Sequence, residues 1–144
     1  MNIENITNLT KDFESFIHHT EEGIEFWLAR ELQYLLNYSE WRNFTNVINK
    51  AKTACEVSGE IVSNHFVDVN KMVIIGSGAE TNIKDIMLTR YACYIIAQNG
   101  DPRKEEIAFA QTYFALRTRQ AEIIEQKLLE VEIMRNFEGL NYEE

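Results

Sequence analysis

The polar residues between positions 40 and 58 have types and a spacing that could bind nucleic acid. Apolar residues recur there at 3, 4, 3, 4 spacing, which predicts a helix whose buried stripe holds Trp41, Phe44, Ile48, Ala51 and Cys55. The opposite side then carries Arg42, Asn46, Asn49, Lys50 and Thr53. Guanidinium, ammonium and amide groups bind phosphates and base edges, so this face is a candidate DNA reader.

The segment before this helix is compatible with such a reader. Leucines predict a shorter helix over 28–36 that ends near Asn37, and Ser39 is placed to cap the helix that follows. A short helix, a tight turn and a longer polar-faced helix resemble in outline a helix-turn-helix. The alternative is an ordinary solvated face, because Asn and Lys are common on surfaces and this face has only two cations.

Residues suited to catalysis do not group into a known motif. The chain has no nucleophile-elbow motif, and His18, His19 and His65 form no ligand set. The Gly-Ser-Gly at 76–78 lacks the following helix and Lys of a phosphate loop. We therefore expect no enzyme, no metal and no cofactor. Cys55 and Cys93 lack CxxC spacing and are expected to be small buried residues rather than a disulfide.

Charge is distributed unevenly along the 144 residues. The net charge is -9, which disfavours nonspecific nucleic-acid binding. Residues 1–25 and 120–144 each carry a net charge of -5, whereas residues 26–119 hold 11 bases and 10 acids. The acidity belongs to the ends, so the centre is not excluded as a DNA-binding body. No apolar run is long enough to cross a membrane and the start lacks the blocks of a signal peptide, so we expect an intracellular protein.

The elements that must position these residues predict an α+β fold. We expect a short helix over 10–18 behind Thr10 as a cap, a turn at 20–23 and a short strand near Ile24 and Phe26. Residues 66–75 and 83–88 predict two antiparallel strands joined by a turn at 76–79. Thr89 should cap the next helix, which a left-handed Asn99-Gly100 ends.

Asp101-Pro102 should begin a long helix, with Glu105 and Glu106 near its positive end. This helix has no breaker before Gly139. Its apolar seam of Ala121, Ile124, Leu128 and Val131 could project, pack on a partner or fold back onto the domain. We expect a mostly helical single domain, with a small antiparallel hairpin or sheet, over residues 1–120 and an acidic helical extension over 121–144.

Three blocks of sequence resemble a known family. They are WLARELQYLLNYSEWRNF at 27–44, HF at 65–66 with IGSGA at 75–79, and KDIMLTRYACYIIAQNGDPRKEEIAFAQTYFALRTR at 84–119. With AKTAC at 51–55, they are similar to the DNA-damage-inducible protein D family, whose members carry a domain like the BRO family N-terminal domain. The similarity spans roughly residues 13–125. Family members are generally longer, so the chain is either part of a longer protein or a short relative.

The resemblance implies a bacterial cytoplasmic regulator of the DNA-damage (SOS) response that binds DNA or restrains a recombinase on single-stranded DNA. It carries over no catalytic motif and no binding residues. If DNA is the ligand, single- or double-stranded, exposure and chemistry favour Arg42, Asn46, Asn49, Lys50, Lys52, Arg103, Lys104, Arg117 and Arg119. If a protein is the ligand, the acidic tail helix would dock on a recombinase filament or another basic partner, or pair with a second copy.

Overall fold

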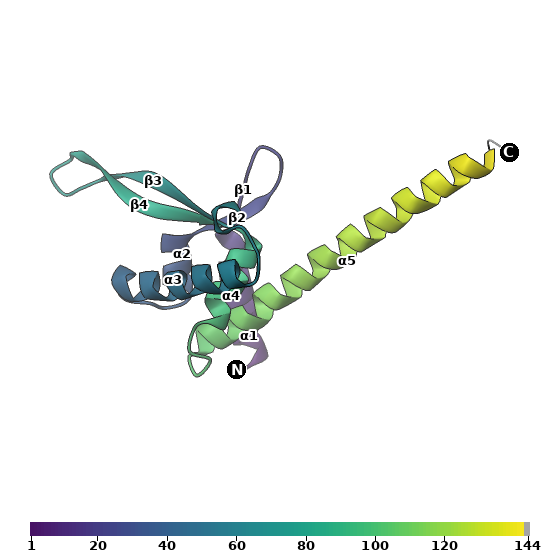
Figure 1. Cartoon of the computed structure of the whole chain (residues 1–144). Coiled ribbons are helices and arrows are strands. Elements are labelled where there is room, and N and C mark those ends of the chain that lie inside the picture. Colours follow the sequence, from purple (N-terminus) through teal and green to yellow (C-terminus); the bar gives the residue numbers. More distant parts are fainter. Residues whose placement is uncertain (143–144) are drawn as a thin grey trace.

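The computed structural model describes residues 1–142, with side chains as far as residue 138. A small antiparallel sheet and four helices form the body, and a fifth helix extends far beyond it (Figure 1). A two-stranded hairpin leaves the body on the side away from the free end of that helix. The predicted α+β class is therefore confirmed. Glu143 and Glu144, the end of the predicted acidic extension, lie outside the described residues.

The sheet has four strands in the order β1-β2-β4-β3. They are β1 (His18–His19), β2 (Glu25–Leu28), β3 (Phe66–Ile74) and β4 (Glu80–Leu88), and every neighbouring pair is antiparallel. The predicted hairpin is confirmed, although β4 begins at residue 80 rather than 83. The pairing of Ile74 with Glu80 continues the ladder to the turn, so the polar start of β4 is ordered by its partner strand.

Helices α2 (Ala29–Leu35) and α3 (Trp41–Val57) agree with the prediction. Asn37 has a φ of 62° and Gly59 a φ of 86°, and these left-handed residues follow the two helices. The prediction that Ser39 caps α3 was wrong, because the N-cap is Glu40 and its side chain makes no capping bond. A short 3-10 turn, η1 (Val62–Asn64), leads from α3 to the hairpin.

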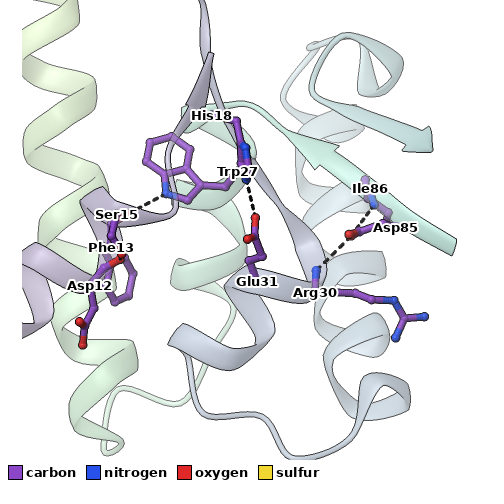
Figure 2. A network of polar contacts seen from close by, with 9 residues as sticks. All are labelled: Asp12, Phe13, Ser15, His18, Trp27, Arg30, Glu31, Asp85 and Ile86. Atoms are coloured by element: carbon purple, nitrogen blue, oxygen red, sulfur yellow. Dashed lines mark hydrogen bonds and ion pairs between the residues drawn. The ribbon is translucent and has the colours of Figure 1, made fainter. Parts of the chain in front are cut away.

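Helix α2 receives its cap from a distant strand. Its N-cap residue, Leu28, has no side-chain acceptor. Asp85 on β4 supplies one, because its Oδ1 accepts from the backbone amide of Arg30 at 3.0 Å and from that of Ile86 at 2.8 Å (Figure 2). The carboxylate is 1% exposed. A negative charge at the positive end of a helix is favourable, which accounts for a buried acid at this position.

Two helices differ from the prediction at their ends. Helix α1 (Ile3–Ser15) begins well before residue 10, with Asn2 as its cap, and Thr10 lies inside it, donating its hydroxyl to Ile6 O. Helix α4 (Arg90–Gln98) has the predicted Thr89 cap, which accepts from Ala92 N. Its end is not left-handed, since Asn99 has a φ of -90°. Gly100 is needed for space, because a Cβ there would lie 2.9 Å from Ile107 Cγ2.

Helix α5 (Glu105–Tyr142) begins three residues after Pro102 rather than at it. Asp101 accepts from Arg103 N in the turn between, and Glu105 and Glu106 lie in the first helical turn as predicted. Ile107, Ala110 and Phe114 are buried against the body. Beyond Ala121 the described side chains are exposed, so the helix projects. Among the described residues, none of the helices combines the length and apolarity that crossing a membrane requires.

The core lies where α1, β2, α4 and α5 meet. Trp27 is fully buried, its Nε1 donates to Phe13 O at 3.3 Å (Figure 2), and its ring meets Phe114 edge-on at 5.1 Å. Phe13 also contacts Tyr113 at 5.4 Å. Both cysteines are buried and free, as predicted. This core lies on one side of the body. On the other side, α3 and the hairpin are exposed to solvent.

Candidate nucleic-acid interface

Helix α3 presents the predicted polar face to solvent. Phe44, Ile48, Ala51 and Cys55 are each fully buried, which confirms the apolar stripe for these four residues and fixes the opposite side. Trp41, which was predicted to be buried with them, is only partly buried because it lies at the cleft beside the hairpin. The residues exposed there are Arg42, Asn43, Asn46, Asn49, Lys50 and Thr53. Among the described residues, no carboxylate lies within ion-pair distance of Arg42, Lys50 or Lys52. Two of these cations, Arg42 and Lys50, lie on the exposed face with no acidic partner to neutralise them.

Lys52 lies apart from the other predicted residues of α3. It is half-buried and turned toward the hairpin, with Nζ 6.0 Å from the centre of the Phe66 ring. Lys52 is seven residues from Thr45 and eleven from Trp41, spacings that place all three residues on one side of the helix. These three residues share a cleft with the hairpin, so Lys52 belongs to a different surface from Lys50.

Three of the four predicted cations on and before α5 form ion pairs with carboxylates. Arg103 forms an ion pair with Asp101 at 3.0 Å, and hydrogen bonds from Arg103 hold the pKa of Asp101 below its usual value. Arg119 lies 3.7 Å from Glu122. Lys104 is different, since its Nζ lies 5.0 Å from the centre of the Tyr38 ring and no carboxylate pairs with it among the described residues.

Arg117 is engaged inside the body. Its guanidinium contacts Glu25 on β2 at 2.5 Å, and Arg90 approaches the same carboxylate at 3.6 Å. The Arg117 side chain is 24% exposed. Its guanidinium carbon also lies 5.5 Å from the ring centre of Tyr113, and burial raises the pKa of Tyr113 to about 12. This cluster ties α4 and α5 to the sheet rather than offering Arg117 to a ligand.

A cleft between α3 and the hairpin adds residues that the sequence did not single out. It has a volume of about 310 Å³ and is lined by Trp41, Thr45, Lys52, Asp68, Val69, Asn70, Lys84, Asp85 and Ile86. Arg30 lies beside it, with its guanidinium carbon 4.1 Å from the centre of the Trp41 ring and Nε donating to Lys84 O at 2.8 Å. One feature of the sequence bears on which hairpin residues line the cleft. The length of the 75–79 turn sets which residues of the two strands lie opposite each other, and so which side chains share a face.

Groups suited to catalysis or metal binding are placed elsewhere. Burial raises the pKa of the Cys93 thiol well above its usual value, and burial also raises that of Cys55. His65 Nδ1 lies 2.7 Å from the Thr89 hydroxyl, and His18 Nε2 lies 2.6 Å from Glu31 (Figure 2). Within residues 1–142, no three His, Cys, Asp or Glu side chains are grouped to hold a metal ion. The polar and charged side chains that could bind a ligand therefore lie on α3 and the hairpin.

Comparison with known proteins covers the same region. Residues 16–115 match the family described as BRO family, N-terminal domain. DNA damage-inducible protein D from Escherichia coli (strain K12) is 49% identical over 115 residues, which cover 80% of this chain and 42% of that protein. The chain thus spans less than half the length of this relative. No solved structure matches it. The matched segment includes α3, the hairpin and the cleft between them, and it ends within α5.

Proposed function

The chain belongs to the BRO N-terminal domain family, and from this premise we propose that it is a non-enzymatic DNA-binding module of a bacterial, cytoplasmic DNA-damage response. The observation that supports this most is the exposed face of α3. Arg42 and Lys50 lie there among Asn46 and Asn49, so charges for phosphates and amides for base edges share one surface. The name of the relative links that protein to DNA damage.

In this proposal the cations near α5 make a smaller contribution. Arg103, Arg117 and Arg119 already contact carboxylates, so moving them to phosphates would cost existing ion pairs. Lys104 has no such partner among the described residues and is the best placed of the four to add a phosphate contact. DNA would therefore lie along α3, with Lys52 at the border of the cleft.

The test is a pair of double variants with the same change in charge. Arg42→Ala with Lys50→Ala should weaken DNA binding about tenfold and lower the slope of log affinity against log salt by roughly 1.4 to 1.8, since each lost phosphate contact contributes about 0.7 to 0.9. Lys127→Ala with Arg135→Ala, on the projecting part of α5, should leave the slope unchanged. Titration at two salt concentrations measures both. Equal slopes for the two double variants would contradict the proposal.

A second function is favoured by the projecting part of α5. Its apolar side chains are exposed, Ile124 at 59%, Leu128 at 65% and Val131 at 54%, and acidic residues surround them. Exposed apolar area on a charged helix marks a protein contact. We propose that residues 121–144 form an acidic extension that docks on a recombinase filament or pairs with a second copy, apart from the body at 1–120.

Replacing Ile124, Leu128 and Val131 together by Gln tests this second function without disturbing the body. The variant should keep DNA affinity and lose either self-association in sedimentation experiments or co-sedimentation with a recombinase filament. A wild-type chain that is monomeric and does not bind the filament would refute the proposal for the extension alone.

A further inference from the structure

The cleft between α3 and the hairpin has two walls of different chemistry. Trp41, Thr45 and Lys52 form the wall on α3. Two residue pairs of the hairpin wall share one face of the sheet, because opposite residues of an antiparallel pair point to the same side, and the intervening Val69–Asp85 pair also lines the cleft. Asn70 is opposite Lys84, and Asp68 is opposite Ile86. The cleft of about 310 Å³ is therefore lined by an indole, aliphatic side chains, two lysines, an amide and two carboxylates, those of Asp68 and the buried Asp85.

Arg30 holds the two walls together at one end. Its guanidinium covers Trp41, and its Nε donates to the Lys84 backbone oxygen. The backbone amide of Arg30 is itself fixed by Asp85 (Figure 2). The Trp41 ring and the backbone at Lys84 are thus positioned before any ligand arrives, and a preformed site loses less conformational entropy on binding.

This set of groups matches one nucleotide unit. An aromatic ring can stack against the Trp41 and Arg30 pair, ammonium groups attract a phosphate, and the Asn70 amide offers a donor and an acceptor. The Asp68 carboxylate accepts only, so it favours a base with an exocyclic amino group such as cytosine or adenine over thymine. A base within a duplex is held in its stack and cannot enter between two walls.

We propose that the cleft bounded by Trp41, Lys52 and Lys84 binds an unpaired, amino-bearing base of single-stranded DNA, with the strand continuing onto the α3 face. This inference rests on the proposed DNA-binding function and makes it more specific. It assigns the chain a preference for single strands and gives the hairpin a role in recognition.

Intrinsic fluorescence provides a direct measurement of the bound base. The chain has two Trp residues, and Trp27 is fully buried, so quenching by a stacked base reports on Trp41. Titration with 12-nucleotide oligo(dC) should quench the emission. The affinity for oligo(dC) should exceed that for oligo(dT) by at least about fivefold, and oligo(dC) should bind more tightly than a 12-base-pair duplex or dCMP. Equal affinity for oligo(dT), the duplex or dCMP would overturn the proposal.

Two lysines of the hairpin form a matched pair of variants. Lys84 lines the cleft on the same face of the hairpin as Asn70, whereas Lys71 lies on the other face, because successive residues of a strand alternate. Lys84→Ala should weaken oligo(dC) binding about five- to tenfold, and Lys71→Ala by less than twofold. Asp68→Asn should remove the preference for oligo(dC) over oligo(dT). Equal effects of Lys84→Ala and Lys71→Ala would refute the site.

The outcomes separate this inference from the function on which it rests. DNA binding that depends on Arg42 and Lys50 but not on Lys84 would leave the α3 interface intact and exclude the cleft. A chain that binds none of the oligonucleotides or the duplex would refute both proposals.

Discussion

Replacing Asp85 tests whether the hairpin and α2 stabilise one another as the structure indicates. The carboxylate is 1% exposed, and its Oδ1 accepts from the amides of Arg30 and Ile86. Helix α2 has no other side-chain cap. Asp85→Ala would leave the Arg30 amide without an acceptor and remove a negative charge from the positive end of the helix.

The expected magnitude follows from three contributions. A buried donor without a partner costs about 1–3 kcal/mol, and loss of a helix cap, which is partly the same interaction, costs about 0.5–2 kcal/mol. Against these, Asp85 Oδ2 is buried with no hydrogen-bond partner among the described residues, so removing the charge recovers some desolvation cost. We expect a net loss of about 2 kcal/mol in the free energy of unfolding.

Urea denaturation of three variants measures this effect. Asp85→Ala should lower the midpoint with an unchanged m-value. Asp85→Asn keeps an acceptor of the same shape and should retain at least about 1 kcal/mol of what Asp85→Ala loses. Asp68→Ala, an exposed acid on the same hairpin, should change stability by less than about 0.5 kcal/mol. The reasoning fails if Asp85→Asn is as unstable as Asp85→Ala, or if Asp85→Ala matches Asp68→Ala.

Three further predictions concern the rest of the body. Burial raises the pKa of Tyr113 from 10.0 to about 12, so as the pH rises the unfolded state loses its proton before the folded state does. The free energy of unfolding of the wild-type chain should therefore fall by about 2 kcal/mol between pH 10 and 12, and that of Tyr113→Phe should fall by less. Urea denaturation across this pH range measures both. Gly100→Ala should lower stability by about 1–3 kcal/mol through its contact with the core, while Gly76→Ala, with open space around it, should be neutral by thermal melting. Glu25→Ala leaves two partly buried guanidinium groups without their carboxylate and should cost about 1–3 kcal/mol in urea denaturation, with Glu22→Ala on the exposed turn as the neutral control.

Elements with a strong local period could be predicted from the sequence. The stripe of α3 follows from apolar spacing alone. Gly59 marks the end of the helix because the chain adopts a left-handed conformation there, which glycine takes without a steric clash. The hairpin follows from two β-branched runs around a Gly-rich turn. Arg42, Asn46, Asn49 and Lys50 were predicted on an exposed face for the same reason, since burying one side of a helix exposes the other.

Features that depend on distant residues could not be predicted in this way. The cap of α2 comes from Asp85, which is 55 residues from Arg30, and no local pattern marks it. Gly100 suggested a left-handed helix end, but it is required by the approach of Ile107. The cleft has the same origin, because Trp41 and Lys84 meet only when the hairpin folds over α3. Residue types alone do not reveal which cations will find carboxylates, as Arg117 does with Glu25.

The projection of α5 carries part of the acidity of this chain, whose net charge is -9, away from the proposed DNA-binding face. Helix α5 rises about 1.5 Å per residue, so Glu130, Glu132 and Glu138 lie roughly 14, 17 and 26 Å past Ala121, the last partly buried residue of the helix as far as residue 138. The Debye length at physiological ionic strength is about 8 Å. The field of these three carboxylates is therefore largely screened at the body, and the cations of α3 have no acidic partner within ion-pair distance among the described residues. Local charge, rather than the total, determines what the α3 face attracts.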